Sequence, residues 1–157
     1  VRSRRQRQMC IRDSMNIAHE QDDSRQEPPV TELSEAESWE LLKQSRFARL
    51  ATRDGDEIDI TPLNIVTDGE KLFFRSAKGT KVLHLQLNPN VTVEIDRAAG
   101  SQAHSVVVRG TAAMVTDTEQ IKHVEELGLR PWLETEKIEF VEITPTRITG
   151  RKFRLGH

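Results

Sequence analysis

"FARLATRDGDEIDITPLNIVTDGEKLFFRS", residues 47–76, contains three short apolar stretches separated by two Asp-Gly pairs. Alternation of apolar and polar residues is typical of a strand with one buried face, and Asp-Gly between such stretches is a strong hairpin signal. This segment therefore predicts three consecutive strands, with turns at Asp54-Gly55 and Asp68-Gly69.

The middle strand changes phase at Pro62. Before it, the apolar residues Ile58 and Ile60 stand at even-numbered positions, whereas after it Leu63 and Ile65 stand at odd-numbered positions. Proline has no N–H to donate to a neighbouring strand, so within sheets it is found mainly at edges and bulges. We therefore expect a β-bulge or an edge position at Pro62.

Helices are expected on both sides of this segment. Ser34, with Glu37 three residues later, forms a capping box for a helix that ends near Gln44. Two further helices are expected over about residues 80–88 and 117–127.

Three more strands follow from the apolar patterns of residues 91–96, 104–115 and 138–153, and a short seventh strand could end the chain. Six or so mostly antiparallel strands with a few helices favour a closed or half-closed β-barrel. The expected fold class is therefore mostly β with flanking helices.

Composition restricts the classes of function. The chain has 157 residues, of which 36% are apolar, enough for one domain with one core. Residues 1–14 hold five arginines and one aspartate, so the other 143 residues hold 18 basic against 24 acidic side chains. An acidic body argues against nucleic acid as the main partner. With one cysteine and no apolar run of membrane-spanning length, we expect a cytoplasmic protein without membrane contact.

The N-terminal region, residues 1–33, is expected to lie outside the folded domain. Residues 1–14 have no periodicity and precede Met15, so we interpret them as a leader foreign to the natural protein, the alternative being a basic tail for nucleic acid or an anionic membrane. Residues 15–33 are acidic, polar and interrupted by two prolines, which predicts a disordered linker. Residues 34–157 are the expected folded domain.

A cationic corner follows the third strand. Arg75 and Lys81 flank a turn in which Ser76 and Thr80 offer hydroxyls and Gly79 allows close backbone approach. Together with the free amides at the start of a helix, such a corner can hold a phosphate monoester. The spacing is not that of a Walker A loop. The alternative interpretation is an ordinary polar loop with solvated lysines.

The order and spacing of several sequence pieces add a second line of argument. These pieces, within about residues 34–154, are ARLAT, DITPLNIV, LFFRSAKGTKV, NPNVTVEID, SVVVRGTA, LGLRPW and ITPTRITGRKF. In this order the chain resembles the pyridoxamine 5'-phosphate oxidase-like flavin-binding split-barrel family, especially its compact bacterial branch. The resemblance implies a six-stranded antiparallel split β-barrel. It further implies a homodimer that binds flavin mononucleotide (FMN) at the subunit interface.

The resemblance also implies which residues contact the cofactor. The strand of Thr61, Pro62, Leu63 and Asn64 would lie along the flavin ring, with its backbone at the ring's polar edge. The ribityl phosphate would be held by Arg75, Ser76, Thr80 and Lys81. Further contacts would come from Ser105 and Arg151, and Trp132 would either cover a flavin bound to the partner subunit or anchor a loop.

The implied activity is hydride or electron transfer through flavin N5 to a small organic substrate, and no catalytic side chain is assigned. The chain has no tyrosine, which argues against synthesis of pyridoxal phosphate. Other possibilities are a deazaflavin-dependent reductase, a non-catalytic flavin or haem carrier or sensor, and a dimeric barrel with an empty cleft. His84 and His104 have no second ligand at metal-binding spacing, so no metal site is expected.

Overall fold

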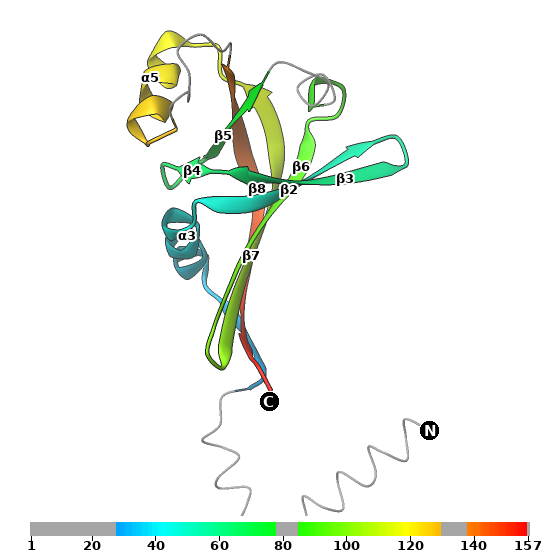
Figure 1. Ribbon diagram of the computed structural model, residues 1–157, viewed down its shortest axis with the longest axis vertical. Helices are drawn as coiled ribbons and strands as arrows, with labels where there is room; N and C mark the ends of the chain where they lie inside the picture. The colour runs from blue at the N-terminus through cyan, green and yellow to red at the C-terminus, as the bar shows by residue number, and fades with distance from the viewer. Residues whose placement is uncertain (1–27, 78–84, 130–137, 157) are drawn as a thin grey trace, which may run out of the picture.

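The computed structural model describes residues 28–77, 85–129 and 138–156. Its strands are β1 (Val30–Leu33), β2 (Phe47–Asp54), β3 (Glu57–Asn64), β4 (Val66–Thr67), β5 (Leu72–Ala77), β6 (Asn90–Ala99), β7 (Gln102–Met114) and β8 (Ile138–Arg154). The helices are α3 (Glu35–Gln44) and α5 (Thr118–Glu126). Figure 1 shows both helices on the same side of the long strand β8.

All the strands belong to one antiparallel sheet with the order β3-β2-β6-β7-β8-β5-β4, and β1 pairs with the far end of β8. The first and last strands of this order, β3 and β4, are separated in the chain by Ile65 alone. The Ile65 N–H donates a hydrogen bond of 3.0 Å to the Arg46 carbonyl oxygen. The chain itself therefore connects the two ends of the sheet and curls it into a barrel, with Ile65 buried at the corner.

Both predicted Asp-Gly turns are confirmed. Gly55 has φ 59° and joins β2 to β3, and Gly69 has φ 92° and joins β4 to β5. Glycine adopts these left-handed conformations without steric cost. In the second turn, the Asp68 carboxylate oxygen Oδ1 accepts hydrogen bonds of 2.8 Å from the backbone N–H of Glu70 and of Lys71. This side chain therefore stabilises the turn directly.

The expected edge position of Pro62 is confirmed, but there is no bulge. β3 is the terminal strand, and its register with β2 is continuous from Asn64 to Glu57, with Pro62 opposite Arg49. The phase change arises because the apolar residues switch faces of a regular strand. Ile58 and Ile60 are each 68% exposed on the outer face. β3 thus presents apolar side chains to both faces of the sheet.

The six expected strands are all present, and β1 and β4 are additional. Residues 30–33 were expected to belong to a disordered linker, but they form β1, with Val30 opposite Phe153 and Leu33 opposite Gly150. The proline pair before this segment obscured its alternation. The last strand is one continuous element rather than two. A bulge lies in the β7–β8 ladder, where Arg109 pairs with Arg147 and Gly110 with Pro145.

Helix α3 begins as predicted. Ser34 Oγ accepts a hydrogen bond from the Glu37 N–H at 3.1 Å, and Glu37 Oε1 accepts one from the Ser34 N–H at 3.2 Å. The Ser34 N–H, together with the Ser34 hydroxyl, lowers the pKa of the Glu37 carboxyl. Leu42 packs into the main core with the inner side chains of the sheet. Asp117 occupies the N-cap position of α5, although its side chain makes no capping bond. The expected helix over 80–88 is described from residue 85 onward, where residues 85–87 are helical and residue 88 is not.

Candidate functional site

A cleft of about 470 Å³ lies where the end of α3, the β3–β4 corner, β5 and the residues after α5 meet. Its position follows from the closure of the barrel, because the corner at Ile65 brings the end of α3 close to β5. The residues that line it are Lys43, Ser45, Arg46, Asn64, Ile65, Val66, Thr67, Arg75, Leu127, Gly128 and Leu129.

The lining of this cleft is cationic. Lys43, Arg46 and Arg75 come from three separate segments, and no carboxylate is among the described lining residues. The two lining hydroxyls already donate within the protein, from Ser45 to the Leu41 carbonyl oxygen at 2.8 Å and from Thr67 to the Lys71 carbonyl oxygen at 2.6 Å. The hydroxyls thus shape the wall. The three cations make the lining positively charged, and Lys43 Nζ also lies 3.6 Å from Glu40 Oε1.

Asp68 and His123 join two segments whose neighbouring residues, Thr67 and Leu127, line the cleft. Asp68 Oδ2 lies 3.1 Å from His123 Nε2, so the β4–β5 turn is joined to α5. Burial alone would raise the pKa of Asp68, but the N–H groups of Lys71 and Glu70 and the His123 ring together hold it below its usual value. The ionised carboxylate is therefore the stable form at neutral pH. The His123 ring also makes an edge contact with Phe73, at a centroid distance of 6.1 Å.

Two of the predicted cofactor-binding residues, Asn64 and Arg75, line the cleft together. Thr61 and Leu63 are half-buried, and Pro62 is exposed. Ser76 follows Arg75 in β5, opposite Glu139. Thr80, Lys81 and Trp132 lie outside the described residues.

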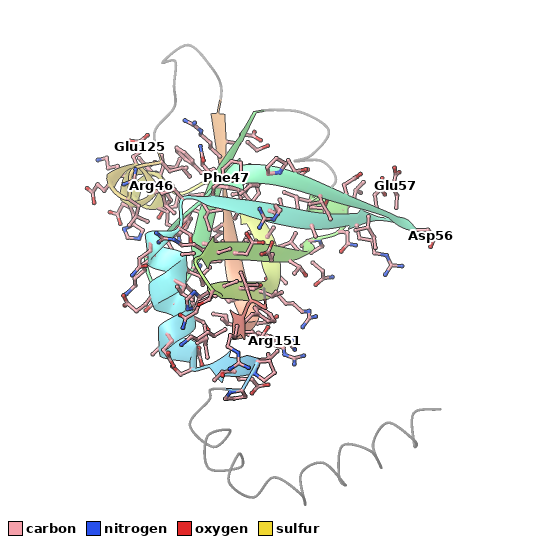
Figure 2. The ribbon with its side chains drawn as sticks, turned by 60° about the horizontal axis from the view of Figure 1, so that its bottom comes forward. Arg46, Phe47, Asp56, Glu57, Glu125 and Arg151 are labelled. Carbon is pink, nitrogen blue, oxygen red and sulfur yellow. The ribbon has the colours of Figure 1, made fainter. Side chains whose placement is uncertain are left out.

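Ser105 and Arg151 also lie together, but in another part of the protein. They are direct partners in the β7–β8 ladder, and Arg151 is also opposite Glu32 of β1. Arg75 is opposite Phe140, so it lies 11 residues from Arg151 along β8, a strand length of about 36 Å. In Figure 2, Arg46, which lines the cleft, is likewise well apart from Arg151, which lies near β1. The described chain therefore does not bring the two groups of predicted residues together.

Sequence reasoning missed the contribution of α3 to the cleft. Lys43 and Arg46 flank the helix end in the sequence KQSR, where cations are commonly explained by the helix dipole. No local pattern indicated that these residues would lie beside β5. The missed residues Thr67, Leu127 and Leu129 line the cleft for the same long-range reason.

Other kinds of site find no support in the described part of the chain. No group of three or more His, Cys, Asp or Glu side chains is placed to hold a metal ion there. Among the described helices none has the length and apolarity needed to cross a membrane. His84 lies outside the described residues, and His104 is half-buried on β7.

The curled antiparallel sheet, closed at one corner and flanked by two helices, is a split β-barrel. Residues 34–152 match the family model described as pyridoxamine 5'-phosphate oxidase, so the chain belongs to that family. A putative pyridoxamine 5'-phosphate oxidase from Corynebacterium glutamicum is similar, with 37% identity, TM-score 0.73, and coverage of 84% of this chain and 99% of that one.

Two further relatives extend the comparison. The FAD-binding protein of Mycobacterium smegmatis has 38% identity and TM-score 0.72, with coverage of 80% of this chain and 100% of that one. A Mycobacterium tuberculosis protein is 32% identical over 91 residues, which are 58% of this chain and 83% of that protein.

Proposed function

We propose that this protein binds a flavin nucleotide and transfers hydride or electrons to a small organic substrate. The observation that carries the proposal is the cleft in which Lys43, Arg46 and Arg75 converge beside Asn64. Three cations from separate segments fit the phosphate of a flavin nucleotide, and the neighbouring terminal strand β3 fits its ring. The flavin-binding relative with 38% identity supports the same assignment.

The residues of the cleft have distinct roles in this proposal. The cations neutralise and orient the phosphate, and Thr80 and Lys81 of the following segment would add to them. β3 ends the sheet, so backbone groups along the outer side of Thr61 to Asn64 can hydrogen-bond to the polar edge of the ring. When bound, the flavin supplies hydride and electron transfer at N5. The protein's contribution is to fix the ring and leave one face open to substrate.

A homodimer completes the site. Ser105 and Arg151 are too far from Arg75 along β8 to reach the same flavin within one protomer, whereas a second copy can present them. The exposed apolar side chains of Phe47, Ile58 and Ile60, which are 60%, 68% and 68% exposed, suit a buried interface between copies. Trp132 of a second copy would cover the ring.

The cofactor we propose is FMN, whose phosphate matches the cationic cleft. FAD is the alternative favoured by the relatives, because both the M. smegmatis protein and a Mesorhizobium loti protein with 25% identity are FAD-binding proteins. A deazaflavin coenzyme would use the same phosphate contacts. A carrier or sensor without catalytic activity would bind the flavin equally and differ in turnover alone.

The deciding experiment is to denature the purified protein and identify any released chromophore by mass spectrometry. Released FMN supports the proposal, and FAD or a deazaflavin would change the cofactor but keep the site. Protein that is colourless and does not bind added FMN would contradict flavin binding. Reduction of the bound flavin by a nicotinamide or deazaflavin donor would then separate an oxidoreductase from a carrier.

A further inference from the structure

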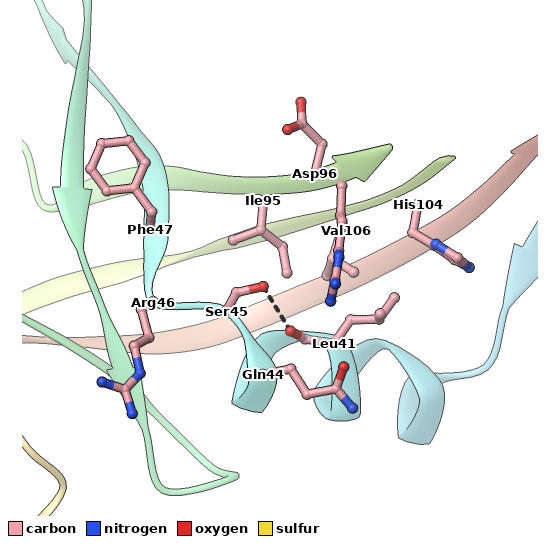
Figure 3. Close-up of a pocket in the computed structure, with 10 residues that line it drawn as sticks. Leu41, Gln44, Ser45, Arg46, Phe47, Ile95, Asp96, His104 and Val106 are labelled. Atoms are coloured by element: carbon pink, nitrogen blue, oxygen red, sulfur yellow. Dashed lines mark hydrogen bonds between the residues drawn. The ribbon is translucent and has the colours of Figure 1, made fainter. Parts of the chain in front are cut away.

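A second cavity, of about 280 Å³, adjoins the cationic cleft. Ser45 and Arg46 line both, so the two spaces share one wall. We call this second cavity the anion pocket. Figure 3 shows it, with Leu41, Gln44 and Ser45 at the end of α3 on one side and Ile95 and Val106 of the sheet on the other. Its residues are Leu41, Gln44, Ser45, Arg46, Phe47, Ile95, Asp96, Arg97, His104 and Val106.

The floor of the anion pocket is apolar. Ile95 and Val106 are direct partners in the β6–β7 ladder and are 4% and 0% exposed, and Leu41 packs against the same core. The volume is near the lower limit for small-molecule sites. This pocket therefore fits a compact molecule with an apolar body.

The rim of the anion pocket carries positive charge without an internal counter-ion. Arg97 and His104 are direct partners in the β6–β7 ladder, on the same face of the sheet. Within the described residues, the side chains of Arg46, Arg97 and His104 make no hydrogen bond or ion pair. The one lining carboxylate, Asp96, is already paired, because its Oδ1 lies 2.7 Å from Arg49 Nη2.

Arg49 also binds Glu94, through its Nε and Glu94 Oε2 at 2.8 Å. Arg49 thus pairs with both acidic side chains of β6, one cation against two carboxylates. The lining of the pocket itself holds two arginines, Arg46 and Arg97, against the one carboxylate of Asp96. A guanidinium beside an apolar floor recognises a carboxylate or a similar anion attached to a hydrophobic group.

We propose that the anion pocket binds a small organic anion with one carboxylate-type group and a compact apolar body, held by Arg97 and His104. The shared Ser45–Arg46 wall places such a ligand next to the cleft, where it would be the substrate, and this role rests on the proposed function. Binding of the anion itself does not require a flavin.

The test uses benzoate as the anion and benzamide as its uncharged analogue of nearly the same shape. Dissociation constants are measured with the full chain by calorimetry or by titration followed with protein NMR. We expect saturable benzoate binding, and a loss of roughly tenfold or more for benzamide or for Arg97→Gln, the effect of one charge-assisted contact. His104→Gln should weaken benzoate binding as well. Arg109→Gln removes an exposed β7 arginine outside this pocket and should bind benzoate as wild type does.

Three results would overturn the proposal: no saturable benzoate binding to the wild type, equal affinities for benzoate and benzamide, or an Arg97→Gln protein that folds and binds benzoate unchanged. Should Arg97→Gln fail to fold, the His104→Gln protein decides in the same way. FMN binding is measured on the same samples. Normal FMN binding without benzoate binding refutes the anion pocket alone, and benzoate binding without FMN binding refutes the flavin site alone.

Discussion

His123 Nε2 lies 3.1 Å from Asp68 Oδ2, and this contact joins helix α5 to the β4–β5 turn, next to Thr67 and Leu127 of the cationic cleft. The two oxygens of Asp68 have separate partners, since Oδ1 accepts from the backbone of the turn and Oδ2 faces the imidazole. The Asp68 side chain is 20% exposed, so its bonds are partly shielded from water.

This arrangement predicts acid-sensitive stability. The folded-state pKa of Asp68 is below its ordinary value of 3.8, so ionised Asp68 stabilises the fold above that value. The stabilisation is lost as pH falls through the lower folded-state pKa. At pH 7 we expect Asp68→Ala to reduce the free energy of unfolding by about 1–3 kcal/mol, because two backbone N–H groups lose their acceptor.

Urea unfolding between pH 7 and the acid limit of the fold measures this effect. Asp68→Asn is the matched variant, because it keeps an acceptor oxygen for the turn and removes the charge. At pH 7 its loss of stability should be smaller than that of Asp68→Ala. The loss should shrink as pH falls, because the wild type then loses the contribution of ionised Asp68. An Asp68→Asn protein with the acid sensitivity of the wild type would show that another carboxyl is responsible.

The cationic cleft predicts the energetics of phosphate binding. Replacing Arg75 and Lys81 together by alanine should weaken FMN binding by roughly 2–5 kcal/mol, because two charge-assisted contacts to the phosphate are lost. Arg46→Ala should weaken it in the same direction, since Arg46 lines the cleft. Quenching of flavin fluorescence on binding gives the affinity.

Arg109→Gln, which changes a cation outside the cleft, is the control for these FMN titrations. Riboflavin lacks the phosphate. Its affinity should therefore differ far less between the wild type and the double variant at Arg75 and Lys81 than the affinity of FMN does. Equal FMN affinities of the wild type and this double variant would contradict the phosphate site.

The separation of Arg75 from Arg151 along β8 predicts complementation between subunits. Arg75→Ala and Arg151→Ala should each weaken flavin binding in their own homodimers. If one flavin contacts Arg75 of one copy and Arg151 of the other, a mixed dimer of the two variants has one intact site and one doubly altered site. If equal amounts of the two variants mix at random, half of the dimers are mixed, and about one quarter of all flavin sites should be intact.

The variants are mixed by unfolding and refolding them together, and high-affinity sites are counted by flavin titration. Each variant refolded alone is the control. The absence of any recovered high-affinity site, from proteins that refold as dimers, would mean that the two arginines do not serve a shared flavin.

Gly110 predicts a stability effect in the barrel wall. A Cβ at this position would collide with the Thr144 carbonyl oxygen and contact the Ile143 side chain at 3.1 Å. The neighbour is backbone of the adjacent strand, so it cannot move without disturbing the bulge. Gly110→Ala should lower the free energy of unfolding by about 1–3 kcal/mol.

Gly156→Ala is the matched control, because a Cβ there meets no atom within 4 Å. Chemical denaturation of both proteins measures the difference. Equal stability of the two variants would indicate that the β7–β8 ladder tolerates a wider spacing at Gly110 than the structure has.

Much of the local structure could be predicted from the sequence. The capping box at Ser34, the Asp-Gly turns and the alternation in β2, β6 and β7 all depend on residues a few positions apart. Such signals act through short-range hydrogen bonds and side-chain periodicity, so they are readable without knowledge of the rest of the chain. Membership of the split-barrel family followed from the order of these pieces.

The phase change at Pro62 left two explanations open, a bulge or an edge position, and the structure confirms the edge position. A bulge and a change of buried face produce the same pattern in a sequence, and they differ only in how the neighbouring strand pairs. The continuous pairing of β3 with β2 decided the matter.

By itself, the sequence determined where the six longer strands after α3, the two Asp-Gly turns and the starts of α3 and α5 lie. Only the tertiary structure decided that Ile65 closes the barrel, that Lys43 and Arg46 join Arg75 in one cleft, and that Ser105 and Arg151 lie far from it along β8. The physical reason is the range of the interactions. Turns and caps are made by neighbours in the chain, whereas the cleft exists because burial of one continuous core curls the sheet and brings distant segments together.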